Sequence, residues 1–256
     1  MTSPAPGRGA GGPVRLVLNP PVAYLQMSDD TGKNLFSTGL FEGLLDSFRQ
    51  IAHSPDIRAV VLRGADGYFC SGASLERMRG PVEGRVDQVW QVLQSVFDCP
   101  VPVIAAVDGH AYGGGLLLAL CCDMAIFSRS ARYAANFLMY GFTPVGGASY
   151  LVPAAMGFRL GSEMLFTGRT YRGDELEQRG AGPLITDHER VFDEACRTAL
   201  RTAAAPRRSL ELLKAELVGP IREATKAAVW RERPAHQETI HRELLERAVR
   251  RTEPEA

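Results

Sequence analysis

The chain has 256 residues, of which 45% are hydrophobic and 23% are charged, so it can bury the core of one large globular domain. This composition excludes a disordered chain, a collagen-like repeat and a mini-protein. Lysine plus arginine number 29 and aspartate plus glutamate number 29, so no net field favours nucleic acid or an anionic membrane, and any partner must be recognised by a local site.

Cysteine spacing and hydropathy limit the setting further. The five cysteines form no CxxC pair, which favours reduced thiols in a cytoplasmic protein over a disulfide framework or a zinc site, and we expect no metal. The longest apolar run, Leu116 to Cys122, is far shorter than the roughly 20 residues that span a bilayer. We therefore expect neither nucleic acid nor a membrane as a partner.

The start of the sequence predicts a tail followed by a β-hairpin. Residues 1–13 are rich in Gly, Pro and Ala and lack the apolar stretch of an export signal, so we expect a disordered tail. From Val14 to Met27, "VRLVLNPPVAYLQM" gives two short β-rich runs that are broken at Asn19-Pro20-Pro21. This is the pattern of a hairpin at the edge of a sheet.

Helical and extended segments then alternate. Apolar residues at helical spacing predict helices over Thr38 to Ala52 and Arg85 to Phe97. Short β-branched runs that end in glycine predict strands at Ile57 to Gly64 and Val101 to Gly109. The alternation of strand, glycine turn and helix is typical of the α/β fold class.

The second half of the chain is chiefly helical. Pro206, Pro220 and Pro234 punctuate its patterned stretches, which predicts a boundary near Ala205 between a mixed α/β core (14–205) and a C-terminal helical region (206–256). The predicted helices cover Arg159 to Thr167, Asp187 to Ala204, Arg207 to Leu217 and Glu223 to Arg250.

Two glycine loops carry the strongest chemical signal. "YFCSGASLERM" (Tyr68 to Met78) and "VDGHAYGGGLLLALCCD" (Val107 to Asp123) each follow a predicted strand and precede a predicted helix. Glycine permits close backbone approach there, and the first N–H groups of a helix point outward with the positive end of the helix dipole behind them. Two such junctions could form an oxyanion hole for a thioester, worth roughly 3 to 4 kcal/mol per donor. Alternatively, the glycines only permit tight helix–sheet packing.

Four motifs together resemble the crotonase, or enoyl-CoA hydratase/isomerase, superfamily over about Val14 to Arg250. They are "SGAS" (Ser71 to Ser74), "PVIAAVDGHAYGGGLLLALCCDMAI" (Pro102 to Ile126), "GFTPVGGASYLVPAAMG" (Gly141 to Gly157) and "GRTYRGDELEQRG" (Gly168 to Gly180).

The resemblance implies a fold, a substrate class and an assembly. It implies a spiral of ββα turns, with a C-terminal helical region that serves in trimer formation and covers the active site. A homotrimer or a hexamer is expected. The substrate would be an acyl thioester on coenzyme A or on a phosphopantetheine arm, with no further cofactor. By position, the oxyanion donors would be the backbone N–H groups of Ala73 and Gly114.

The catalytic glutamates of hydratases in this superfamily are missing. One lies three residues after the middle glycine of the GGG motif, and the other lies seven residues before the proline of the G-x-x-P motif. Here those positions hold Leu117 and Phe137. Neither side chain can carry a proton, so hydration by two carboxylates and isomerisation by one are both disfavoured.

A narrower resemblance offers another activity. "NFLMYGFTPVGGASYLVP" (Asn136 to Pro153), "YRGDELEQRG" (Tyr171 to Gly180) and "HQETIH" (His236 to His241) are similar to enzymes of polyketide β-branching that act on acyl groups tethered to an acyl-carrier protein. In that branch one crotonase-like enzyme decarboxylates a 3-methylglutaconyl-type thioester, and a histidine of the C-terminal region serves the active site. His236 occupies that position.

Three functions therefore stay open. Decarboxylation would leave a dienolate on the oxygen held by Ala73 and Gly114, and His236 would supply the proton. A double-bond isomerase could use the same groups, and Leu75 favours it, because related enzymes commonly carry lysine or another polar residue there to meet the departing carboxylate. A non-catalytic subunit that binds an acyl carrier is the third possibility.

Other candidates flank the predicted site. Tyr68 and Tyr140 are expected to be wall residues of the substrate pocket rather than proton donors. Asn136 could bond the substrate or serve a cap or turn. His236 could instead be a surface residue, since "RERPAHQETIHREL" is polar all round. Cys70 has no cationic neighbour in the sequence, so an inert buried thiol is expected.

Overall fold

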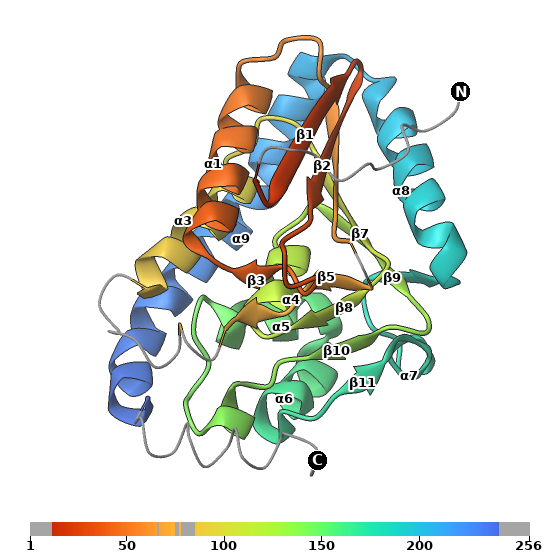
Figure 1. Cartoon of the computed structure of the whole chain (residues 1–256). Coiled ribbons are helices and arrows are strands. Elements are labelled where there is room, and N and C mark those ends of the chain that lie inside the picture. Colours follow the sequence, from red (N-terminus) through yellow and green to blue (C-terminus); the bar gives the residue numbers. More distant parts are fainter. Residues whose placement is uncertain (1–11, 66, 75–76, 78–84, 241–256) are drawn as a thin grey trace.

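The computed structural model describes residues 12–65, 67–74, 77 and 85–240. It is a mixed α/β structure in which one large sheet, a smaller sheet lying across its end and a set of covering helices are arranged around a shared core (Figure 1). The predicted α/β class is confirmed.

The large sheet has the strand order β1-β2-β4-β7-β9-β12. Strands β1 and β2 form the predicted antiparallel hairpin at its edge, and all other neighbours in this sheet are parallel. The six strands are β1 (Val14–Asn19), β2 (Val22–Met27), β4 (Ala59–Arg63), β7 (Val103–Val107), β9 (Met124–Ser128) and β12 (Leu184–Thr186).

Alternate residues of the central strands face two different cores. Val60 and Leu62 of β4 pack in the main core, which includes residues of α1 (Thr38–Ala52) and α3 (Arg85–Phe97). Val61 lies in the second core, which α8 (His188–Ala203) covers with its alanines. Both faces of the parallel sheet are therefore buried, which explains why its strands read as near-continuous apolar runs.

The smaller sheet has the order β11-β10-β8-β5. Its strands are β5 (Tyr68–Cys70), β8 (His110–Tyr112), β10 (Arg132–Ala134) and β11 (Tyr171–Arg172), and a short ladder joins β3 (Leu35–Phe36) to β6 (Gly72–Ala73). A strand of the large sheet is followed by a strand of the smaller sheet three times, as β4 then β5, β7 then β8, and β9 then β10. The ββ unit therefore repeats three times. Because successive repeats add parallel strands, the loops after β5 and β8 leave the same sheet edge, where α/β proteins bind ligands.

The remaining helical segments are α4 (Gly114–Leu120), the 3₁₀ turn η1 (Phe137–Tyr140), α5 (Ala148–Met156), α6 (Phe158–Thr167), α7 (Gly173–Gln178) and α9 (Arg207–Thr239). Three of them, at 137–140, 148–156 and 173–178, were not predicted from the sequence. In the described ranges, no helix combines the length and the apolar character needed to cross a bilayer.

Helix α9 corrects one prediction. The sequence indicated two helices separated near Pro220, but α9 continues through both Pro220 and Pro234. A proline inside a helix removes a hydrogen bond and costs about 3 kcal/mol. Burial of α9 side chains such as Val229 against the rest of the molecule offsets that cost. The predicted boundary near Ala205 falls between α8 and α9, and the division into two regions stays a prediction.

Lys214 anchors the first half of α9 to the core. Its side chain is 5% exposed, and Nζ donates to the carbonyl O of Val96 (3.1 Å), the carbonyl O of Val101 (3.1 Å) and Oδ2 of Asp123 (2.9 Å). The same Asp123 oxygen accepts the N–H of Val103 (2.6 Å) at the start of β7. One buried cation therefore connects α9, the end of α3 and two strands of the large sheet.

We predict that Lys214→Met lowers the free energy of unfolding by about 3 kcal/mol, because it leaves the mostly buried carboxylate of Asp123 and two buried carbonyls without their cation. Urea denaturation would measure the change. Arg49→Met is the control. Arg49 pairs with Asp46 at the surface, where both side chains are more than half exposed, so this variant should lose far less free energy of unfolding. Equal losses in the two variants would contradict the assignment.

Candidate active site

The two glycine loops touch at positions that leave no room for a side chain. Gly72 has a φ of +72°, and a Cβ atom there would lie 2.9 Å from the carbonyl O of Tyr112 and 3.0 Å from the amide N of Gly114. A Cβ atom on Gly115 would lie 2.0 Å from the carbonyl O of Cys70. Glycine is therefore required at both positions by close backbone approach.

Buried Asn34 and strand β3 hold the first loop in place. The Asn34 side chain donates from Nδ2 to the carbonyl O of Tyr68 (3.0 Å) and of Phe69 (3.2 Å). In the parallel ladder, Phe36 of β3 pairs with Ala73 of β6. These contacts fix the backbone on both sides of the loop, and the sequence motifs did not single out Asn34.

Ala73 and Gly114, the predicted oxyanion donors, line one pocket. Gly114 is the first residue of α4, so no carbonyl of its own helix can accept its N–H. Phe36 lies against both residues, because it pairs with Ala73 and because a Cβ on Gly114 would lie 2.4 Å from its ring. The structure thus brings the two predicted donors to the same cavity.

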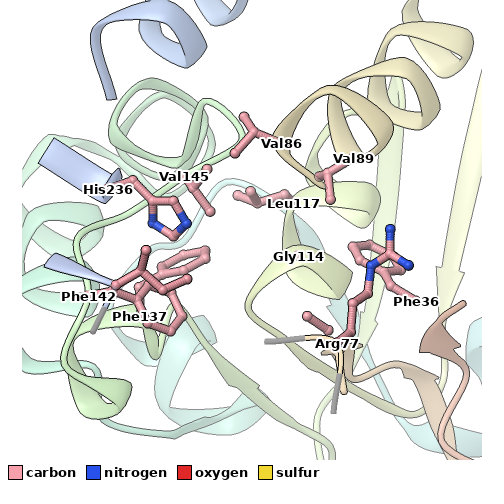
Figure 2. A pocket seen from close by; sticks show the side chains of 12 residues that line it. Phe36, Arg77, Val86, Val89, Gly114, Leu117, Phe137, Phe142, Val145 and His236 are labelled. Atoms are coloured by element: carbon pink, nitrogen blue, oxygen red, sulfur yellow. The ribbon is translucent and has the colours of Figure 1, made fainter. Parts of the chain in front are cut away.

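The pocket encloses about 600 Å³, counting the space at its open mouth. Figure 2 shows His236 on one side of the cavity and Arg77 on the other, with apolar side chains between them. Its lining residues come from segments far apart in the sequence: Phe36, Ala73, Arg77, Val86, Val89, Gly114, Leu117, Phe137, Phe142, Val145, His236 and Ile240.

Leu117 and Phe137, which stand at the positions of the missing glutamates, form part of the apolar lining. Leu117 is 1% exposed and Phe137 is 5% exposed. Among the described lining residues there is no aspartate or glutamate. The described lining therefore offers no carboxylate pair that could deliver and remove water.

His236 is buried in the pocket wall rather than exposed on the surface of α9. Its ring packs edge-on against Phe142, with centroids 5.2 Å apart, and Nδ1 lies 3.2 Å from the carbonyl O of Thr143. A carbonyl oxygen can only accept a hydrogen bond, so Nδ1 is the donor. Nε2 is then the nitrogen that gains and loses a proton when the imidazole titrates.

Arg77 is a lining residue that the sequence motifs did not reveal. Its guanidinium lies 4.8 Å from the centroid of the Phe41 ring, and it donates a hydrogen bond to Gln88 of α3. Partial burial lowers the pKa of Arg77 from its ordinary value, which still leaves the group charged at neutral pH. Arg77 lies in the first glycine loop, four residues after Ala73, but its contact with Phe41 joins residues 36 positions apart in the chain.

Three predicted pocket residues lie outside the lining set. Tyr68 packs edge-on against His110, with ring centroids 5.1 Å apart. Tyr140 lies nearly parallel to the ring of Phe142, with centroids 6.3 Å apart, and is not among the lining residues. Asn136 precedes η1 without a side-chain cap, and its Oδ1 would lie 3.3 Å from a Cβ on Gly113. Leu75 lies outside the described residues.

Cys70 is the inert buried thiol that we expected. It is fully buried, and burial raises its pKa to about 12. Its Sγ donates to the carbonyl O of Asn34 (3.0 Å), so it supports the first loop from behind. Among the described residues, no group of three or more His, Cys, Asp or Glu side chains could hold a metal ion.

Several known proteins are similar to this chain in sequence and in fold. The enoyl-CoA hydratase/isomerase family pattern matches residues 18–253. The bacillaene synthase decarboxylase PksI of Bacillus subtilis is 38% identical over 230 residues, which cover 90% of this chain and 92% of PksI.

Two solved structures extend the comparison. One, described as part of a dehydratase/decarboxylase couple of polyketide β-branching, superimposes with a TM-score of 0.88 at 35% identity and covers 95% of this chain and all of the other. The ECH2 decarboxylase domain of CurF from Lyngbya majuscula superimposes with a TM-score of 0.85 at 34% identity. The match covers 94% of this chain and 99% of that domain. The crotonase fold and the resemblance to decarboxylating members are confirmed. The chain belongs to the enoyl-CoA hydratase/isomerase, or crotonase, family.

Proposed function

We propose that the protein is a decarboxylase that acts on a 3-methylglutaconyl-type acyl thioester in polyketide β-branching. Its relatives include enzymes named as decarboxylases, one of them from a β-branching couple. The observation that carries the proposal is the lining of the pocket. It joins two glycine loops to an apolar wall that holds His236 and Arg77 and, among the described lining residues, no carboxylate.

The reaction breaks the bond between the γ carbon and its carboxylate. The electron pair of that bond becomes part of a dienolate, and carbon dioxide leaves. The developing negative charge reaches the thioester oxygen, where the N–H groups of Ala73 and Gly114 would bind it. No base is needed, because the carboxylate departs without a proton.

His236 would then supply the proton that converts the dienolate into product, at its α or γ carbon. The Thr143 carbonyl holds Nδ1–H, so the proton would leave from Nε2 of the imidazolium. Solvent restores that proton after each turnover.

Arg77 would bind the carboxylate before it departs. The position of Leu75 offers no cation, but Arg77 places a guanidinium in the lining of the same pocket. Arg77 can therefore orient the substrate while the apolar wall disfavours the charged carboxylate relative to neutral carbon dioxide.

This cation favours decarboxylation over the two alternatives. A double-bond isomerase would use His236 first as base and then as acid, and it would keep the carboxylate, so Arg77 would have no part in the chemical step. A non-catalytic subunit would need no histidine fixed inside the pocket by Thr143.

The carrier and the assembly belong to the same proposal. We expect the acyl group to arrive on an acyl-carrier protein, although a phosphopantetheine arm is shared with coenzyme A. Large apolar side chains on α9, such as Leu217 (61% exposed) and Trp230 (57% exposed), support assembly into a homotrimer or hexamer, which light scattering on the purified protein would test. The cytoplasmic location stays a prediction.

We predict that incubation with a 3-methylglutaconyl carrier protein lowers the mass of that carrier by one carbon dioxide, as measured by mass spectrometry of the intact protein. The acyl carrier without enzyme is the control for spontaneous loss. An unchanged mass, with or without a change in the ultraviolet absorbance of the conjugated thioester, would reject decarboxylation.

We further predict that Arg77→Met raises the KM for the carboxylated thioester by about 10-fold or more, since a charge-assisted pair contributes about 1.5 to 3 kcal/mol. Binding of the decarboxylated product thioester should change little, because it has no carboxylate to lose. Arg77→Lys should recover part of the affinity, and Arg208→Met, at an exposed site, is the control. Equal weakening of substrate and product binding would show that Arg77 acts only through packing.

A further inference from the structure

A buried carboxylate that the proposed mechanism does not use lies one helical turn before His236. In the described part of the chain, Lys214, Glu232 and His236 are the buried side chains of Lys, Arg, Asp, Glu or His, and all three lie on α9. Glu232 is 8% exposed, so hydrogen bonds must compensate for the loss of water around its carboxylate.

Glu232 caps a different helix. Its Oε2 accepts the N–H of Gly147 (2.7 Å) and its Oε1 accepts the N–H of Ser149 (2.7 Å), at the start of α5. Gly147 has a φ of +84° and cannot provide a cap of its own, and a Cβ there would lie 2.5 Å from Thr225 of α9. The carboxylate therefore replaces the missing cap and lies at the positive end of the α5 dipole.

The capped segment is also the wall around His236. Between η1 and α5, Phe142 and Val145 line the pocket, and the carbonyl O of Thr143 binds Nδ1 of His236. The N–H of Thr143 donates to Oγ1 of Thr239 (3.0 Å). Helix α9 thus contacts this one segment through Glu232, His236 and Thr239 in successive turns.

The backbone of α9 alone does not fully fix the position of His236. Pro234 has no N–H, so the carbonyl of Trp230 receives no helical hydrogen bond from it. The backbone ladder of α9 therefore lacks one hydrogen bond between Trp230 and Pro234, and side-chain contacts to the neighbouring segment help to set the position of the last turns.

We propose that Glu232 is a positioning residue for His236. Its carboxylate holds residues 147–149, which fixes the segment that carries the Thr143 carbonyl, and that carbonyl sets the direction and the tautomer of the imidazole. Only the activity measurement below rests on the proposed function.

Glu232→Gln is the sharpest test, because it keeps the shape of the side chain. A glutamine has one oxygen for two N–H groups, and its NH₂ would face a donor. We expect kcat for decarboxylation to fall about 10-fold with KM changed less than about 2-fold, since a misplaced acid slows the proton transfer without weakening substrate binding.

A second measurement needs no activity. Diethyl pyrocarbonate modifies histidine, and peptide mass mapping separates His236 from the other histidines. We expect His236 in Glu232→Gln to react several-fold faster than in the unmodified sequence.

Two controls separate positioning from stability. Glu238→Gln makes the same chemical change at an exposed position of α9, and Lys214→Met destabilises the helix far from the pocket. Neither should change kcat or the modification rate of His236. If Glu232→Gln does not fold, Glu232→Asp keeps the charge but is one methylene shorter, and we expect it to give intermediate values.

The outcomes are distinct. A Glu232 variant that loses stability but keeps both kcat and the His236 modification rate would overturn the proposal, since Glu232 would then be only a cap. If the unmodified protein shows no decarboxylation, the proposed function fails, and the modification rate alone decides whether Glu232 positions His236.

Discussion

The site depends on the contact between Gly72 and the first turn of α4. A side chain on Gly72 would meet the amide N of Gly114, and a side chain on Gly115 would meet the carbonyl O of Cys70. The ββ repeat brings these two loops to one sheet edge, and glycine allows them to touch. Without that contact, the two predicted donors could not line the same pocket, and the proposed binding site for the thioester oxygen would not form.

The rest of the pocket determines which reaction that oxygen supports. Hydration needs groups that add and remove protons beside the double bond, but Leu117 and Phe137 contribute only hydrocarbon to the pocket lining. Loss of carbon dioxide needs a stabilised oxyanion, a bound carboxylate and one acid. The N–H groups of Ala73 and Gly114 would stabilise the oxyanion. Arg77 would bind the carboxylate, and His236 would be the acid.

Much of the fold was predictable because its signals are local. The β1–β2 hairpin and helices α1 and α3 follow from apolar spacing and turn residues within short windows, and the glycine loops mark the sheet edge. His236 was predictable only through the family resemblance, since its segment is polar in sequence although the His236 side chain itself is buried in the structure.

The features that the sequence did not reveal depend on distant contacts. Helix α9 passes through Pro220 because packing against the core outweighs a local signal to stop. Arg77 reaches the pocket beside Phe41, and Glu232 finds its donors more than eighty residues earlier in the chain. Tyr68 and Tyr140 flank the loops in sequence, but Tyr68 packs against His110 and Tyr140 packs against Phe142, and neither tyrosine lines the pocket.

The central claim is that carbon dioxide loss creates a dienolate that one enzyme-bound acid then protonates. Its most direct test is the reaction of the 3-methylglutaconyl carrier protein in deuterium oxide, with carbon dioxide and product mass measured together. We predict one deuterium in the product for each carbon dioxide released. Deuterium uptake without carbon dioxide release, or neither event, would contradict it.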